Sequence, residues 1–396
     1  MATTYAIDGK QFSAGTAELQ HALHKAHGDK KRPLCQCRTP GVPMYVAKVG
    51  GTFYVKRMPD TGSDHAPACD SYEPPAELSG LGQVAGSAIS EDPDGTTTLK
   101  FDFALTKKPG RAAPAPGEGG GDSVATDGNK LSLRGTLHFL IEEAGFNRWT
   151  PAMNGKRNWF VVRRHLLEAA ENKMAKGTSL GDILYIPESF NLDKKDEITQ
   201  RRQAQWMKIA TPTGGTRRLM LAIGEVKAIE PSRYGHKIVL KHLPDAPLML
   251  NEDIHKRMNK RFEQELGLWD AVEDSHLMVI CTFSIGATGI ASVEELALVL
   301  MLDSWIPFEN LYEKMLLDKL IASNRRFTKG MRYNLPAGQP LAVAVLTDTQ
   351  PEATALYVDL PGTTDAHTAA LDKLIEESKL TSWRWDASNA TMPDLP

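Results

Sequence analysis

Long apolar runs and cysteines are what this 396-residue chain has least of. No stretch approaches the ~20 apolar residues of a membrane-spanning helix, so the sequence predicts no membrane anchor. The first residues, MATTYAIDGKQF, lack the basic start and apolar core of a signal peptide. There are only four cysteines and three of them are clustered, which is not the pattern of a disulfide scaffold. Together these absences favour a cytoplasmic protein in a reducing compartment.

An excess of either charge is also missing. The chain has 46 lysines and arginines against 49 acidic residues, for a net charge of −3. This balance predicts no strong overall attraction to nucleic acid or to an anionic membrane, although local basic patches remain compatible with it. The length suits about two to four domains.

The clustered cysteines are the sharpest chemical feature of the sequence. Cys35 and Cys37 precede two strand-like stretches, 44–49 and 52–57, and His65 and Cys69 follow them. The two glycines at 50–51 suit a hairpin turn, which would bring the four side chains together. Sites rich in thiolate are usually closed tetrahedra of zinc that stabilise small folds. The sequence therefore predicts a structural zinc site, against the alternative of three unrelated buried thiols and a surface histidine.

Composition and periodicity divide the chain into four parts. Residues 1–106 form the predicted zinc-binding, β-rich module, and the proline- and glycine-rich stretch 107–130 reads as a flexible linker. Residues 131–303 form a predicted α+β middle region, and 304–396 a C-terminal domain. The fold class is thus a multidomain α+β protein. Helices are expected at 16–27, 131–144, 159–176 and 251–270, and strands at 182–186, 218–229, 236–243, 276–285 and 292–303, the last with a competing helical signal.

The last hundred residues have the clearest order of elements. Apolar spacing predicts a helix at 309–323, strands at 327–333, 341–347 and 355–360, a helix at 364–378 and a strand at 382–385. The expected order is therefore α-β-β-β-α-β.

Several short motifs carry a resemblance that covers most of the chain. They are RGTLHFL at 134–140, GKR at 155–157, EVK at 225–227, KHLP at 241–244, LYEK at 311–314, RRF at 325–327 and the CQC…HAPAC segment itself. Together they resemble a bacterial family of unassigned function whose members are often carried on conjugative plasmids and integrative elements. The resemblance implies a mobile-element context, with DNA and the proteins of such an element as candidate partners.

The C-terminal order of elements resembles the restriction-endonuclease-like core of the PD-(D/E)-x-K nucleases. In such enzymes an acid of the first helix, an Asp of the second strand and Glu-x-Lys of the third hold metal ions for phosphodiester hydrolysis. Glu309 or Glu313 matches the helix acid, although helical spacing also fits both as a solvated face. The second strand opens on Leu341 and the third has no lysine. The resemblance therefore implies a degenerate nuclease fold without catalytic residues, with migrated ligands at Glu309, Glu313, Asp348 and Asp359 as the alternative.

Basic pairs recur along the chain and supply the candidate nucleic-acid contacts. Those singled out are Lys156, Arg157, Arg163, Arg164, Arg325 and Arg326. The leading functional hypothesis is a non-enzymatic accessory protein of a mobile element that binds nucleic acid or a DNA-processing partner. The alternatives are a metal-dependent nuclease with migrated ligands and a protein-interaction module that does not bind DNA.

Overall fold

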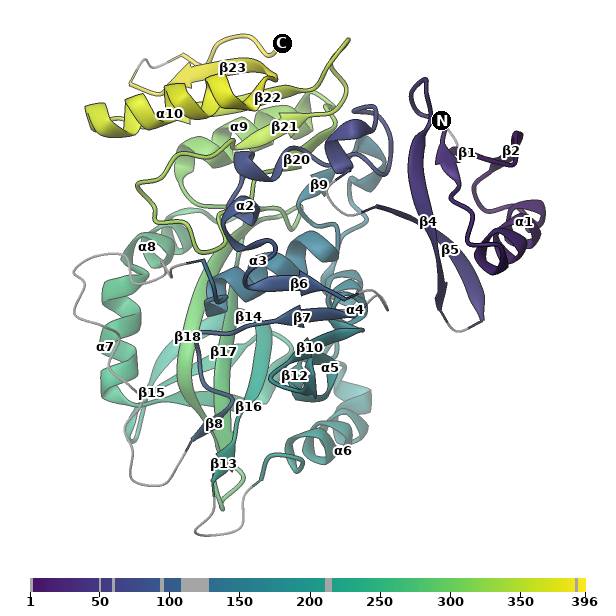
Figure 1. The fold of residues 1–396 in the computed structure, drawn as a ribbon. Helices are drawn as coiled ribbons and strands as arrows, with labels where there is room; N and C mark the ends of the chain where they lie inside the picture. Colours follow the sequence, from purple (N-terminus) through teal and green to yellow (C-terminus); the bar gives the residue numbers. More distant parts are fainter. Residues whose placement is uncertain are drawn as a thin grey trace. The chain divides into compact units, whose positions relative to one another are not determined.

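The fold is described from a computed structural model over residues 3–49, 51–58, 61–92, 96–107, 128–210, 216–388 and 391–396 (Figure 1). The chain divides into two compact units. The first contains Met1–Leu78, Arg326–Thr328 and Ala342–Pro396, and the second contains Ser79–Arg325 and Lys329–Leu341. The two ends of the chain thus share one unit, whereas the sequence suggests consecutive domains with boundaries at 106, 130 and 303. Apart from Lys107 and residues 128–130, the predicted linker lies outside the described residues.

The N-terminal part of the first unit is an antiparallel sheet with one helix. Its strands lie in the order β2-β1-β3-β4-β5. The predicted hairpin is confirmed, since Val49 pairs with Thr52 and Gly51 has a φ of 87°. The predicted helix at 16–27 is also confirmed, and its buried leucines pack with Phe53. The elements are β1 (Thr4–Ile7), β2 (Lys10–Ser13), α1 (Ala17–Gly28), β3 (Leu34–Cys35), β4 (Val42–Val49) and β5 (Thr52–Arg57).

The C-terminal part of the first unit is a mixed sheet covered by a helix. Its strands lie in the order β23-β22-β21-β20, with β22 parallel to β23 and antiparallel to β21. Tyr72 and Leu78, from the loop that follows the hairpin, share a core with Ala355, Tyr357 and Leu371. This shared core explains why residues 1–78 group with the C-terminus. The elements are η1 (Gly62–Asp64), η2 (Ala76–Leu78), β20 (Phe327–Lys329), β21 (Ala344–Leu346), β22 (Thr354–Asp359), α10 (Asp365–Ser378) and β23 (Thr381–Asp386). The last residue of β20, Lys329, belongs to the second unit.

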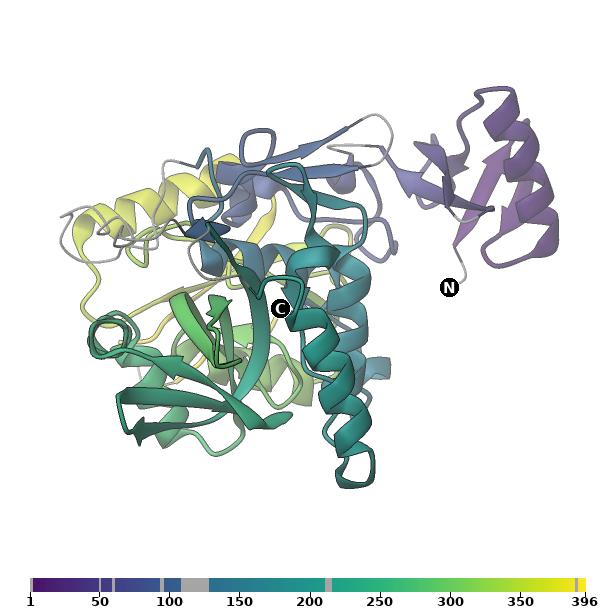
Figure 2. The same ribbon diagram turned by 90° about the horizontal axis from the view of Figure 1, so that it is seen from below.

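The second unit is built on a large, mostly antiparallel sheet (Figure 1 and Figure 2). Strands β14, β15, β16, β18 and β17 pair in that order, and β17 pairs back with β14, so the sheet closes on itself. Its long strands are β14 (Met220–Ser232), β15 (Gly235–Leu240), β16 (Leu243–Leu250), β17 (Ser275–Ile285) and β18 (Ala291–Leu302). The strand prediction at 292–303 is confirmed, because the apolar run from Leu296 onward is buried in the sheet.

The remaining elements of this unit are short strands and helices. The strands are β6 (Ile89–Glu91), β7 (Thr97–Leu99), β8 (Thr106–Lys107), β9 (Arg148–Trp149), β10 (Lys173–Ala175), β11 (Thr178–Ser179), β12 (Leu184–Tyr185), β13 (Arg217–Arg218) and β19 (Pro307–Phe308). The helices are α2 (Leu81–Val84), α3 (Leu133–Glu143), η3 (Pro151–Met153), α4 (Trp159–Ala170), α5 (Leu180–Ile183), η4 (Leu192–Lys194), α6 (Lys195–Trp206), α7 (Glu252–Arg261), α8 (Glu263–Ala271) and α9 (Leu311–Ala322). In the described ranges, no helix has both the length and the apolarity needed to cross a bilayer.

Three boundaries expected from the sequence are wrong. The helix at 159–176 ends at Ala170, because the next residue is extended and Asn172 has a φ of 56°. The helix at 251–270 is two helices, interrupted at the buried Phe262, whose ψ of 31° leaves the helical range. The strand at 182–186 is the end of the short helix α5 followed by β12. In contrast, the α-β-β-β-α-β order of the last hundred residues is confirmed by α9, β20, β21, β22, α10 and β23.

Candidate metal centre

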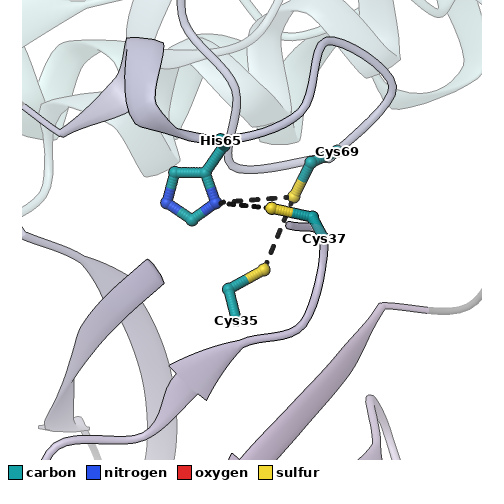
Figure 3. Close-up of side chains that lie close together, drawn as sticks. All are labelled: Cys35, Cys37, His65 and Cys69. Atoms are coloured by element: carbon teal, nitrogen blue, oxygen red, sulfur yellow. Dashed lines mark hydrogen bonds between the residues drawn. The ribbon is translucent and has the colours of Figure 1, made fainter. Parts of the chain in front are cut away.

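The four predicted ligands meet in the first unit. Cys35 ends β3 and Cys37 lies in the turn after it, while His65 directly follows the short helix η1 and Cys69 lies in the following turn. Figure 3 shows the three sulfur atoms and the imidazole pointing toward one another. One potential ligand atom from each residue lies within 4.8 Å of all the others. The cluster can therefore hold a metal ion.

Three of the separations between these atoms are close to those expected around a tetrahedral ion such as zinc. Zn–S bonds of about 2.3 Å and Zn–N bonds of about 2.0 Å place two sulfurs about 3.8 Å apart and a sulfur and a nitrogen about 3.5 Å apart. Here the sulfurs of Cys35 and Cys69 are 3.7 Å apart, and Nδ1 of His65 lies 3.3 Å from the Cys37 sulfur and 3.7 Å from that of Cys69. Four protein ligands would fill all the positions of a tetrahedral ion, which is the pattern of a structural site.

Hydrogen bonds and burial affect the protonation of the four side chains. The backbone N–H groups of Ala66 and Ser71 donate to the sulfurs of Cys37 and Cys69, each at 3.4 Å, and would stabilise thiolates there. Burial raises the pKa of Cys35 to about 12, so an ion that binds has to displace the thiol proton. Burial also lowers the pKa of His65, which keeps the imidazole in its neutral, metal-binding form.

A close backbone approach shapes the loop that carries His65 and Cys69. The carbonyl of Gly62 accepts the N–H groups of His65, at 3.4 Å, and Glu73, at 3.2 Å. A Cβ atom at Gly62 would lie 2.6 Å from the Cβ of Glu73, so only glycine fits. The loop then continues to Tyr72 in the C-terminal core, and the partly buried Cys69 packs against both that core and the cluster around Cys35. An ion bound here would therefore tie β3 to a loop that belongs to the C-terminal core.

Each of the four candidate nuclease carboxylates forms an ion pair with a basic side chain or accepts a backbone N–H. Glu313 is buried, 3.4 Å from the buried Lys329, so its expected solvated position is wrong. Its carboxylate also accepts the backbone N–H of Glu309 at 2.9 Å. The other engaged pairs are Glu309 with Arg332, Asp348 with the backbone N–H of Arg326, and Asp359 with Arg384.

A second buried acid, which the sequence analysis does not single out, lies in the closed sheet. Glu225 of β14 accepts hydrogen bonds from Nδ1 of His276, at 2.6 Å, and from Lys241, at 2.5 Å. Burial would raise the pKa of Glu225, but these two hydrogen bonds outweigh it and hold the pKa below its ordinary range. Trp305 stacks on His276 with ring centroids 4.0 Å apart. Only the EVK and KHLP motifs, which contain Glu225 and Lys241, give a sequence signal for this cluster.

The six basic candidates differ in what their side chains contact. Arg157 donates to the carbonyls of Phe146, Ser304 and Gly145 at 3.0–3.3 Å, so its guanidinium is bound within the protein, and burial lowers its pKa to about 10. Arg163 donates from Nε to a backbone carbonyl at 3.0 Å. The other four are wholly or partly exposed: Lys156, Arg164, Arg325 and Arg326.

The comparisons with known proteins give the family of the chain. A family model described as "Protein of unknown function (DUF1173)" matches residues 5–388, and the chain belongs to this family. The expected membership in a family of unassigned function is thereby confirmed. Comparison with curated proteins and with solved structures finds no match for the chain.

A buried histidine in the second unit gives a pH prediction. Burial, with Arg134 nearby, lowers the pKa of His138 to about 3, and its Nδ1 accepts the N–H of Tyr333 at 3.0 Å. The unfolded chain protonates this histidine near pH 6.5 and the folded chain does not. The contribution of neutral His138 to the free energy of unfolding is therefore fully present above pH 6.5 and is lost as the pH falls toward 3. The expected loss between pH 7 and pH 5 is about 2 kcal/mol.

The measurement is the opening free energy of the α3 amides by hydrogen exchange, at pH 7 and pH 5. His138→Gln should be less stable at pH 7 but should lose about 2 kcal/mol less than the parent chain between the two values. An unchanged slope in His138→Gln would assign the pH dependence to another group.

Proposed function

We propose that this chain is a non-enzymatic, cytoplasmic accessory protein of a mobile genetic element that binds nucleic acid. In this proposal zinc, bound by Cys35, Cys37, His65 and Cys69, holds the N-terminal module in shape. The mobile-element context rests on the family resemblance of the motifs. The binding function rests on one observation in the second unit, at the start of α4.

That observation is a line of exposed basic and aromatic side chains. Phe160 is 64% exposed, and the side chain of Arg164, four residues later on the same face of α4, is also 64% exposed. Lys156 is exposed just before the helix, and Arg163 is partly exposed beside Arg164. An exposed aromatic ring stacks on unpaired bases and neighbouring cations contact phosphates, so this surface suits single-stranded nucleic acid. We call Lys156, Phe160, Arg163 and Arg164 the α4 surface.

The nuclease alternative is less well supported by the same structure. Metal-dependent hydrolysis needs carboxylates gathered around one ion. The described groups of possible metal ligands contain cysteine and histidine clusters and include none of the four candidate acids. Glu309 and Glu313 also face the cations Arg332 and Lys329, which compete with an incoming ion.

The test is binding of a fluorescent single-stranded oligonucleotide to the full chain, followed by anisotropy over a range of salt. Phe160→Ala should weaken binding about 5-fold or more, because stacking on one ring contributes about 1–3 kcal/mol. Arg164→Ala should weaken binding and reduce the salt dependence by about one phosphate contact.

Two control variants separate the α4 surface from general surface effects. Ile290→Ala removes a 51% exposed apolar side chain elsewhere, and Lys373→Ala removes a cation that, like Arg164, pairs with an acid four residues on. Both should bind like the parent chain. Equal binding by all variants would reject the α4 surface. Capture of a protein but no nucleic acid from lysate would favour the interaction module, and Mg²⁺-dependent cleavage lost in Glu313→Ala would favour the nuclease.

A further inference from the structure

A second group of possible metal ligands lies in the second unit, where β15 begins. It consists of His236 at the start of β15 and of Glu252 and His255 in the first turns of α7. The sequence analysis does not identify it, because the histidines are far apart in the chain and each looks isolated. We infer that these three side chains bind a divalent transition metal ion, independently of the cysteine cluster.

The register of the sheet brings the three residues together. His236 pairs with Leu250, the last residue of the antiparallel strand β16. Asn251 then caps α7 by accepting the N–H of Ile254 at 2.8 Å, so the helix starts beside His236. Figure 1 shows α7 alongside β15. Gly235 makes the approach possible, since it has a φ of 106° and a Cβ there would lie 2.4 Å from the carbonyl of Leu250.

The side chains lie close enough to share one ion. Glu252 and His255 are three residues apart and therefore on one face of α7. A potential ligand atom from each of the three residues lies within 4.8 Å of the other two, and Nδ1 of His236 is 3.7 Å from the Glu252 carboxylate. Ligand atoms on one tetrahedral zinc ion are about 3.4 Å apart, so shifts of about an ångström would complete the site. The two imidazoles stack, with ring centroids 3.4 Å apart, so one ring has to turn before a nitrogen of each can face the same ion.

An unsatisfied nitrogen is the independent observation that points to a ligand. Nδ1 of His236 is buried and makes no hydrogen bond within the described part of the chain. A buried polar atom without a partner costs free energy, so such atoms are rare and a bound ion is one explanation. The neighbouring His255 makes a hydrogen bond through Nε2, which lies 3.2 Å from the side-chain amide of Asn259. Outer contacts of this kind orient histidines that bind metals.

The types of ligand indicate which ions this site would prefer. The number of ligands distinguishes it from the cysteine cluster. Two imidazoles and a carboxylate suit zinc, cobalt or nickel rather than calcium or magnesium. Three protein ligands leave at least one position open, which water or an oxygen of a small anion would fill. The cysteine cluster, with four ligands, has no such position.

The test is a Co²⁺ titration of the full chain after weakly bound metal has been removed with a mild chelator. Cobalt bound by nitrogen and oxygen gives weak visible bands, whereas cobalt bound by cysteine adds strong near-ultraviolet thiolate bands. We expect one added cobalt per chain without thiolate bands. His255→Ala and Glu252→Gln should each weaken this binding at least about tenfold and leave the tightly held metal unchanged.

His165→Ala is the matched control, because His165 also lies 3.3 Å from a glutamate three residues on but has no third ligand in the described clusters. It should bind cobalt like the parent chain. No cobalt binding, binding only with thiolate bands, or equal binding by His255→Ala and Glu252→Gln would each overturn the inference. Circular dichroism of the variants checks the fold, and both substitutions lie at the surface of α7.

Discussion

Cys37→Ser should remove the tightly bound metal and unfold residues 30–75. Binding of structural zinc contributes about 10–16 kcal/mol in small modules, which is comparable to the whole stability of a domain. The cluster around Cys35 and the cluster beside α1 are both small, so they supply little core to keep the sheet folded without the metal. Elemental analysis measures the metal, and hydrogen exchange of β3, β4 and β5 measures the local unfolding.

The C-terminal sheet should also lose protection in this variant. The sequence alone predicts that the tail stays folded, because the proline- and glycine-rich linker would uncouple it. The structure places Tyr72 and Leu78 in one core with Ala355 and Tyr357, so unfolding of their loop uncovers β22. Full protection of β21 and β22 in Cys37→Ser would instead support independent modules.

Cys281→Ala is the matched control for the loss of a thiol. Cys281 is buried in β17 of the second unit and lies outside the cluster. The substitution should cost some packing free energy but leave the metal content unchanged. Equal metal loss in both variants, or retention of the metal in Cys37→Ser, would contradict the assignment of the ligands.

Lys329→Met should destabilise the second unit by about 3–5 kcal/mol, or lower its melting temperature by roughly 10 °C. The side chains of Lys329 and Glu313 are 2% and 4% exposed, so the substitution leaves a buried acid without its cation. Thermal unfolding followed by tryptophan fluorescence measures the loss. Lys373→Met, which breaks an exposed pair with Glu377, should cost less than about 1 kcal/mol.

The dependence on pH and a second substitution separate charge from packing. Burial raises the pKa of Glu313, and Lys329 opposes this, so removing Lys329 raises the pKa further. When a carboxyl has a raised pKa in the folded chain, the free energy of unfolding falls as the pH rises above the pKa of the unfolded chain, near 4.5. The stability difference between Lys329→Met and the parent chain should therefore grow from pH 5 to pH 8. Glu313→Gln added to Lys329→Met should recover part of the loss. A deficit independent of pH, with no recovery, would assign the effect to packing alone.

The features predicted correctly from the sequence are mainly local ones. The cysteine cluster could be found because cysteine is rare and a hairpin between two ligand pairs brings them together. The order of elements in the last hundred residues follows from apolar spacing within each element. The helix break at Phe262 could not be predicted, since the charged, amphipathic pattern continues through it.

The features that sequence reasoning missed depend on long-range packing. Nothing local marks Tyr72 as part of a C-terminal core, so the grouping of the two chain ends was not expected. Glu313 looks like a solvated helix residue until β20 places Lys329 against it. His236 and His255 meet only through the pairing of β15 with β16 and the cap at Asn251.

The most direct test of the account is the metal content and X-ray absorption of the purified full chain at the zinc edge. The account predicts one tightly bound zinc per chain, surrounded by three sulfur atoms at about 2.3 Å and one nitrogen at about 2.0 Å. A folded chain without metal, or a tightly bound zinc with no sulfur ligands, would contradict it.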